Sequence, residues 1–144
     1  VEQDTDRVLI HSTFELSGTR FPLNGANIRI GQKPIASVTA IRYLNESGSD
    51  RTVSTSTYAL DLGAREIYLL PGKSWPSAMT YHRSVRIEYV AGYGAESSSV
   101  PGLLRDLVNL YCDSRFNESQ TAQDAYEATV QRVIPTSYTE APLP

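Results

Sequence analysis

The sequence predicts an α+β protein with a central meander of short antiparallel strands followed by two C-terminal helices. Between residues 28 and 90, apolar residues alternate with polar ones in several short runs, the period of half-buried strands. Beyond residue 100 the apolar residues recur at helical spacing instead. The two patterns occupy separate parts of the chain, which is typical of α+β domains.

The bulk composition fits one folded domain. The chain has 144 residues, of which 40% are hydrophobic, enough to bury a core. We expect residues 1–135 to form this domain and residues 136–144, which show no periodicity, to form an extended tail. Thirteen Lys+Arg against sixteen Asp+Glu give a net charge of −3, which argues against a protein that grips nucleic acid by neutralising phosphates. No apolar run approaches the ~20 residues of a membrane span, so we expect no membrane association.

The strand region follows a short N-terminal segment. Residues 1–9 (VEQDTDRVL) have the apolar spacing of the last turns of a helix whose start precedes Val1. Asn45 to Asp50 is expected to be a solvated hairpin turn, and Trp75 to anchor its loop to the sheet. Extended segments are expected at residues 11–16, 28–30, 38–44, 52–57, 58–62, 66–70 and 85–89.

Two helices are expected in the last third of the chain. Pro101 suits the first turn of one helix, with the preceding serines as caps, and Pro135 ends the other. The apolar stripe of the first helix is Val100, Leu103, Leu104, Leu107, Val108 and Tyr111. The stripe of the second is Ala122, Ala125, Tyr126, Thr129, Val130, Val133 and Ile134.

The turn between the last strand and the first helix has two possible roles, a ligand cradle or a fixed corner. Phosphate-binding loops open directly into a helix and usually include a lysine. Here six residues separate Gly94 from Pro101, and no lysine follows. We therefore expect Gly92, Tyr93, Gly94 and Pro101 to form a structural turn, in which glycine supplies a positive φ.

The remaining residues offer no recognisable chemistry. His11 and His82 lie far apart, and neither has a partner at metal-ligand spacing. Cys112, the single cysteine, is expected to be a small core residue on the first helix. The Asn45 to Asp50 segment lacks the ligand alternation of a calcium loop. We predict no catalytic residues, no cofactor and no metal site, and hence no enzyme.

Aromatic residues are more prominent than catalytic ones. The chain has nine tyrosines. Those in predicted strands can be core residues, whereas those in loops and helices are either contacts between subunits or ordinary half-buried side chains. One alternative function follows from this composition: a small β-rich carbohydrate- or peptide-binding module that uses Trp75 and exposed tyrosines.

Four sequence segments follow one another in the order PIASVTAIRYLNESG, STYALDLGAREIYLLPGKSWP, VRIEYVAGYG and VPGLLRDLVNLYCDSRF. This ordered set resembles the head–tail connector proteins of long-tailed phages, also called adaptor or head-completion proteins. Relatives of this family occur in prophages and gene transfer agents. Thr5, Arg7 and Leu9 match the family's opening pattern at the end of a helix. Family members usually begin with further N-terminal helices.

The resemblance implies a structural virion protein at the head–tail junction, present in the bacterial host cytoplasm before assembly. About a dozen copies would form a ring with heterologous contacts. The ring would join the portal protein of the filled head to a downstream neck (stopper) or tail-completion protein. DNA would pass through it without specific binding, and the mild negative charge agrees with such a conduit.

The C-terminal tail carries the docking prediction. Tyr138, Pro142, Leu143 and Pro144 lie on a segment that cannot form a core element but contains apolar residues. We expect this segment to dock in extended form on the portal or on a neighbouring subunit. The alternative is a frayed terminus.

Overall fold

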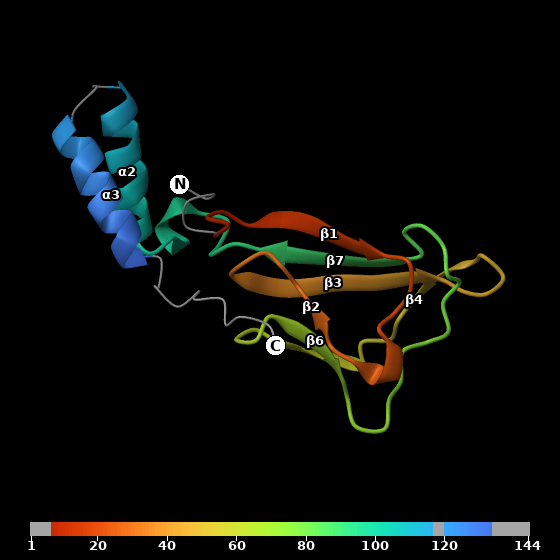
Figure 1. The fold of residues 1–144 in the computed structure, drawn as a ribbon. Coiled ribbons are helices and arrows are strands. Elements are labelled where there is room, and N and C mark those ends of the chain that lie inside the picture. Colours follow the sequence, from red (N-terminus) through yellow and green to blue (C-terminus); the bar gives the residue numbers. More distant parts are fainter. Residues whose placement is uncertain (1–6, 117–119, 134–144) are drawn as a thin grey trace, which may run out of the picture.

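The computed structural model describes residues 7–116 and 120–133, which form two parts (Figure 1). We call residues 7–91 the β body and the helices α2 and α3 the helical hairpin. The elements of the chain are β1 (Ser12–Gly18), η1 (Leu23–Gly25), β2 (Ile28–Arg29), β3 (Ile35–Leu44), β4 (Asp50–Thr52), β5 (Tyr58–Asp61), β6 (Glu66–Leu69), β7 (Val85–Ala91), η2 (Ser97–Ser99), α2 (Gly102–Phe116) and α3 (Gln120–Val133).

The strands form two antiparallel sheets. One has four strands in the order β1-β7-β3-β4, and the other has three in the order β2-β6-β5. The predicted antiparallel strands and C-terminal helices are therefore confirmed. The strand order is not sequential, because β7 inserts between β1 and β3. This central place explains the strict alternation of β7, whose Val85, Ile87, Tyr89 and Ala91 are all buried.

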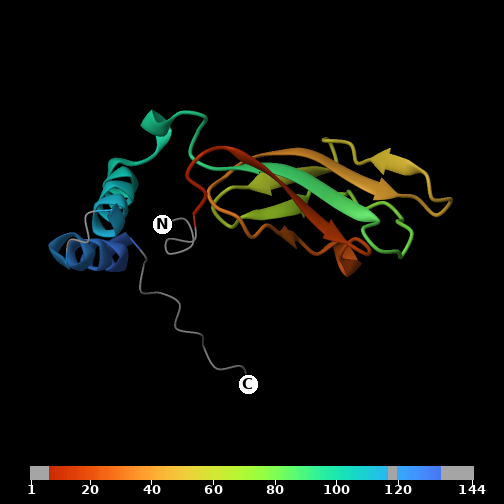
Figure 2. The same ribbon diagram turned by 90° about the horizontal axis from the view of Figure 1, so that it is seen from above.

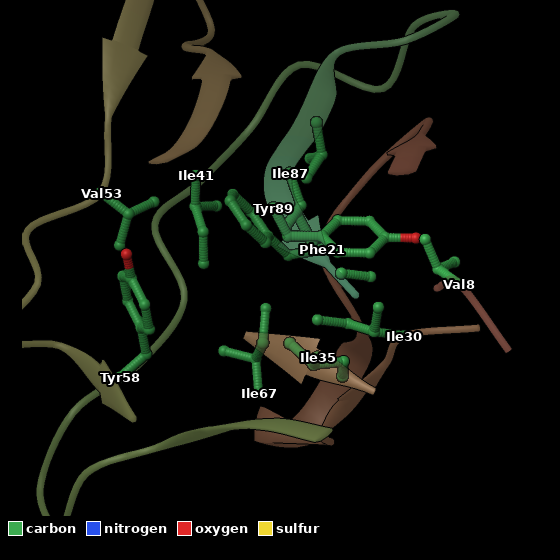
Figure 3. Close-up of a cluster of buried hydrophobic side chains, with 12 residues drawn as sticks. Val8, Phe21, Ile30, Ile35, Ile41, Val53, Tyr58, Ile67, Ile87 and Tyr89 are labelled. Carbon is green, nitrogen blue, oxygen red and sulfur yellow. The ribbon is translucent and has the colours of Figure 1, made fainter. Parts of the chain in front are cut away.

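The main hydrophobic core lies between the two sheets (Figure 3). Ile41 and Ile87 of the four-stranded sheet and Ile67 of the three-stranded sheet are at most 2% exposed. Figure 3 shows side chains from both sheets converging, with the Phe21 ring among them. Sheet-on-sheet packing of this kind gives the β body a core of its own.

Strand boundaries differ from the predicted ones where turn chemistry competes with pairing. β3 begins at Ile35, three residues before the predicted start. The predicted return strand 52–57 is wrong in its extent, because the paired residues are Asp50–Thr52. The Asn45 side chain causes this early start: it accepts hydrogen bonds from the backbone N–H groups of Ser47 and Ser49, at 3.1 and 2.8 Å, and so closes a tight turn.

The N-terminal segment is not helical where the structure describes it. Residues 1–6 of the predicted helix end lie outside the described residues, and Arg7 to Leu9 have no helical structure. Val8 instead packs into the β core and donates its N–H to the Lys33 carbonyl at 2.8 Å. Burial of Val8 and this backbone bond hold the segment extended.

The helical hairpin projects from one end of the β body, as the two perpendicular views show (Figures 1 and 2). α2 begins one residue after Pro101, whose carbonyl accepts the N–H groups of Leu104 and Arg105 at 2.9 and 3.2 Å. Pro101 therefore occupies the capping position rather than the first turn. α3 ends its described part at Val133, and the predicted stripe residue Ile134 and the stop at Pro135 lie outside the described residues.

Candidate assembly surfaces

The turn after β7 joins three parts of the chain through its backbone. Gly92 has φ 125° and donates its N–H to the Pro34 carbonyl at 2.8 Å. A Cβ at this position would lie 2.6 Å from the Ile10 carbonyl carbon, so a side chain cannot fit without movement. The Gly94 carbonyl accepts the His11 N–H at 2.8 Å. The turn therefore holds the N-terminal segment against the end of β7.

Gly94 and Tyr93 extend this junction to the helices. A Cβ on Gly94 would lie 2.4 Å from the Ser99 Cβ, so the turn and η2 are in close contact. The Tyr93 N–H donates to the Leu9 carbonyl at 3.2 Å, and its hydroxyl accepts a hydrogen bond from the Arg7 guanidinium. Because the N–H groups of Gly92 and Tyr93 are already donated, neither is available to a phosphate. The role of this turn as a fixed corner in an assembly stays a prediction.

The helical hairpin has only a thin core. Its buried cluster consists of Val100, Leu104 and Leu107, packed against Leu9, Tyr93, Tyr126 and Val130. On the same hairpin Leu103 is 49% and Phe116 is 84% exposed. Two helices that meet along a single seam leave their other apolar positions open to solvent. The hairpin therefore presents apolar surface suited to a partner.

A groove lies where the N-terminal segment meets α2. It has a volume of ≈ 530 Å³ and includes the apolar side chains Leu9, Ile10, Val100 and Val108. The Ile10 side chain is 40% exposed there. We call it the α2 groove.

The loop that contains Trp75 is fixed to the β body, as predicted. The Trp75 ring stacks on Phe21 with centroids 5.2 Å apart and an interplanar angle of 1°. Its indole N–H donates to the Ala26 carbonyl at 3.2 Å. Phe21 also contacts the Tyr43 ring at 5.7 Å. These three contacts tie the loop to the turn before β2 and to the end of β3.

A groove of ≈ 650 Å³ runs beside this stack. We call it the Trp75 groove and define it by Arg20, Phe21, Pro22, Lys73, Trp75 and Pro76. Two aromatic rings and two prolines line it together with small, aliphatic and uncharged polar residues, and its two charged lining residues are basic. Leu23, on the adjacent η1 turn, also lines it and is 63% exposed.

The outer face of the four-stranded sheet is charged. Glu15 lies directly opposite Glu88 across β1 and β7, and Arg86 lies opposite Arg42 across β7 and β3. Like charges placed directly opposite destabilise a sheet, unless neighbours of the other sign compensate them. Arg83 pairs with Glu15, and Arg86 pairs with Asp50 at 2.8 Å. This face is therefore a surface of mixed charge.

The possible metal ligands do not form a cluster among residues 7–116 and 120–133. His11 and His82 are exposed. No three His, Cys, Asp or Glu side chains in these ranges cluster closely enough for a metal ion. Within the same ranges, no helix is both long and apolar enough to cross a bilayer.

The prediction that Cys112 is a core residue is wrong, because its side chain is exposed. The inward seam of α2 follows Leu104, Leu107 and Tyr111. Cys112 comes one position after Tyr111 and is rotated about 100° away from that seam.

The tyrosines divide between core and surface. Tyr58 and Tyr89 are buried in the β body, and burial raises the pKa of both hydroxyls above the usual 10.0. Tyr68 and Tyr81 are 38% and 62% exposed. Tyr111 and Tyr126 contact each other across the hairpin, with centroids 5.4 Å apart. The predicted docking residues Tyr138, Pro142, Leu143 and Pro144 lie outside the described residues.

Solved structures share this fold. A chain from the "Neck of native GTA particle computed with C12 symmetry", where GTA is gene transfer agent, matches with a TM-score of 0.74 and 25% identity, over 97% of this chain and 78% of the other. A chain from the "Neck of empty GTA particle computed with C6 symmetry" matches with a TM-score of 0.73 and 25% identity, over 97% and 74%. A chain from the "Virion of native gene transfer agent (GTA) particle" matches with 0.72 and 26%, over 97% and 73%.

The predicted resemblance is confirmed. The chain has the fold of a chain from gene transfer agent particles, over nearly its whole length. No protein-family profile matches the sequence, and no curated protein matches it either. The similarity to gene transfer agent chains that the ordered motifs indicated is therefore seen in the comparison of structures.

Sequence reasoning missed two of the surfaces described above. The charged face combines residues from β1, β3 and β7, and their register is visible only once β7 is placed between the other two strands. The Trp75 groove combines the turn at Arg20–Gly25 with the loop at Lys73–Pro76. One signal was available for the groove: both segments contain a proline next to an aromatic residue.

Proposed function

We propose that this chain is a structural protein of a virion neck. In this proposal about a dozen copies form a ring that joins the portal of the filled head to the neck and tail and lines the DNA exit channel. The observation that carries the proposal is the similarity over 97% of the chain to a chain of a gene transfer agent neck. The C12 and C6 symmetries of the two neck structures are both compatible with a twelve-membered ring.

The distribution of apolar surface supports a ring. In a cyclic assembly of identical subunits, one face of each copy contacts a different face of the next. The chain has such different faces: exposed Leu103 and Phe116 on the helical hairpin, and the Trp75 groove on the β body. We assign the hairpin to contacts with the portal and between subunits, and the β body to the wall of the ring.

The charge of the chain supports a conduit rather than a DNA-binding protein. A formal charge of −3 supplies no net attraction for phosphates. Arg86 on the outer face of the four-stranded sheet is paired with Asp50, and Arg83, just before β7, is paired with Glu15 on the same face. DNA can pass such a surface without being held.

The proposed partners are the portal protein on the head side and a downstream neck (stopper) or tail-completion protein on the other side. The protein would be found in the bacterial host cytoplasm before assembly and in the virion afterwards. Residues 136–144, with Tyr138, Pro142, Leu143 and Pro144, would dock on the portal or on a neighbouring copy. If deletion of residues 136–144 left assembly with the portal unchanged, this last part would be wrong.

The experiment that tests the function is a mass measurement of the full chain, alone and mixed with purified portal. We expect a small species alone and a ring-sized complex with the portal. In cells, loss of the gene should leave filled heads without tails, and a plasmid copy should restore them. A chain that stays a monomer beside the portal, together with normal tailed particles in its absence, would contradict the proposal.

A carbohydrate- or peptide-binding module remains the alternative from a different class. The Trp75 ring disfavours the carbohydrate version, because Phe21 covers one of its faces and its N–H is bonded to Ala26. A sugar could therefore stack on at most one face of the indole. A monomer that retains a glycan in solution and ignores the portal would favour this alternative.

A further inference from the structure

We infer that the Trp75 groove of one copy binds residues 136–144 of a neighbouring copy. The inference rests on the proposed ring, since it requires adjacent copies, and it names the site on which the tail docks. It is carried by the shape and charge of the groove, by the composition of the tail, and by the positions of the two on the molecule.

The aromatic side of the groove is held in place by contacts within the β body. Phe21 is only 6% exposed, and Trp75 lies flat against it, held by the hydrogen bond to Ala26. Pro22 and Pro76 follow these two aromatic residues directly and have restricted backbones. A rigid aromatic and proline surface loses little entropy when a ligand binds. Such surfaces recognise proline-rich segments in the polyproline II conformation.

Charge restricts the ligand further. Arg20 and Lys73 line the groove and are exposed, and neither makes an ion pair with another residue in the described part of the chain. No acidic residue lines the groove. The site therefore favours a proline-rich peptide that carries negative charge.

Residues 136–144 of this chain have that composition. The sequence TSYTEAPLP contains Pro142 and Pro144 around Leu143, and its single charged side chain is the acidic Glu140. Two prolines in three residues favour polyproline II over helix or strand. Leu143 and Tyr138 can supply the apolar contacts, and Glu140 can pair with Lys73 or Arg20.

The fold indicates that the tail comes from a neighbour. The groove lies at the Tyr43 end of β3, through the contact between Phe21 and Tyr43. The opposite end of β3, at Ile35, pairs with Ala91 just before the turn that leads to the helices. The residues of η1 line the groove. Figures 1 and 2 show η1, the short turn between β1 and β2, at the end of the β body away from the hairpin.

The separation is too large for a chain's own tail to fill its own groove. Eight strand steps from Ile35 to Tyr43 correspond to roughly 26 Å. About eight extended residues are needed to cover that length, so of residues 134–144 only the last three would reach the groove. Glu140 and Tyr138 could not contact it in the same copy. The tail of a neighbouring copy does not have this limit. When the tail at the hairpin end of one copy fills the groove at the far end of the next copy, the contact is heterologous, which is the kind of contact that rings use.

The test uses the full chain, in which Trp75 is the only tryptophan and thus a fluorescent reporter of the groove. A synthetic peptide of residues 134–144 should change the Trp75 emission in a saturable manner, and a scrambled peptide should not. Without peptide, the emission should change with protein concentration in parallel with self-association measured by sedimentation. Emission unaffected by the peptide, or independent of protein concentration, would overturn the inference.

A charge exchange sharpens the test. Lys73→Glu in the protein, or Glu140→Lys in the peptide, should each weaken binding about threefold to tenfold. The two changes combined should restore binding to within about twofold of the original. Arg51→Glu is the matched control, an exposed charge reversal on β4 outside the groove, and should have no effect. If the combined changes failed to restore binding, the proposed pairing would be wrong.

Failure of this inference is distinguishable from failure of the proposed function. If the peptide does not bind but a ring-sized complex still forms with the portal, the tail docks elsewhere and only the inference falls. If neither the peptide binds nor the complex forms, both fall.

Discussion

The β body and the helical hairpin differ in how completely each buries its own apolar residues. The β body has a two-sheet core with twelve buried residues, including Ile41 and Ile67 at 0% exposure. The hairpin cluster has three buried residues, and three of its members, Leu9, Tyr93 and the buried Val100, come from outside the two helices. The hairpin also leaves Leu103 and Phe116 exposed. The β body is stabilised by its own packing, whereas the stability of the helical hairpin depends on contacts with neighbouring segments.

This difference indicates a division of roles. A self-contained core keeps its shape before and after assembly, which suits the wall of a channel. A hairpin with an incomplete core gains most from a partner, since apolar surface removed from water contributes roughly 25 cal/mol per Å². The junction at Gly92 to Gly94 connects the two, so its geometry sets how the hairpin is presented.

The largest effect is expected in the β core. Ile67→Ala removes a fully buried side chain and should lower the free energy of unfolding by about 2–5 kcal/mol, through lost burial and a residual cavity. The measurement is urea unfolding of the full chain followed by near-ultraviolet circular dichroism. A loss below about 1 kcal/mol would show that the β body is not close-packed.

Leu107→Ala is the matched change in the hairpin, where Leu107 is also at 0% exposure. We expect it to reduce helicity and hairpin protection in hydrogen exchange while β-body amides keep theirs. If both variants destabilised the whole chain equally, the two parts would form one cooperative unit and the comparison would fail.

The next effect concerns the junction. Gly92→Ala places a Cβ 2.6 Å from the Ile10 backbone and forces a side chain to adopt φ 125°, so we expect a loss of about 1–3 kcal/mol. Gly48→Ala is the control: its φ of 79° is also left-handed, but no atom lies within 4 Å of the added Cβ. Denaturant unfolding of both variants separates the contact from the backbone strain. Equal losses would mean that the close approach to Ile10 contributes nothing.

Sequence patterns predicted the elements of this fold better than their arrangement. Period-two alternation located β7, and the stripe through Leu104 and Leu107 located α2, because both signals are local. The position of β7 between β1 and β3 depends on pairing between residues far apart in the chain, which no local pattern encodes. The helix end predicted at residues 1–9 failed over Arg7 to Leu9, because burial of Val8 in the β core overrode its helical spacing.

The candidate surfaces were predictable to different degrees. The glycines after β7 marked a tight junction, since positive φ and close backbone approach leave few alternatives to glycine. Trp75 was expected to anchor its loop, and its stack on Phe21 confirms this. The groove beside the stack was not predicted, because Arg20 and Lys73 meet there only after the two sheets have packed, and the paired aromatic–proline steps were the one signal for it.

A smaller effect on stability, with a larger one on assembly, is expected at the tip of α2. Phe116 is 84% exposed, so Phe116→Ser should change the free energy of unfolding by less than about 0.5 kcal/mol. If the hairpin packs on partners, the same change should reduce the yield of ring-sized complex with the portal. Thr13→Ala, an exposed substitution on β1, should leave both quantities unchanged. Normal complex formation by the Phe116 variant would show that Phe116 is not part of the interface.

The smallest effect is a pH dependence confined to the β body. Burial raises the pKa of the Tyr89 hydroxyl above 10.0, and the hydrogen bond from the Gln32 backbone only partly opposes it. The folded protein therefore holds this proton more tightly than the unfolded chain does. The protonated Tyr89 hydroxyl therefore contributes to the free energy of unfolding. This contribution is fully present below about pH 10 and is lost as the pH rises through the pKa of the folded state. Urea unfolding between about pH 9 and 11 should show this fall.

Tyr89→Phe should reduce the slope of stability against pH in that window, and Tyr58, whose pKa burial also raises, should supply the remaining slope. Its absolute stability is a poor readout, because the variant also loses the hydrogen bond from Gln32, worth roughly 0.5–1.5 kcal/mol at every pH below the transition. The change in the slope of the free energy of unfolding against pH reports only the ionisation of the Tyr89 hydroxyl. Tyr81→Phe, which removes an exposed hydroxyl, should keep the wild-type slope. An unchanged slope in the Tyr89 variant would show that this hydroxyl reaches water, and that the β body is less closed than its packing indicates.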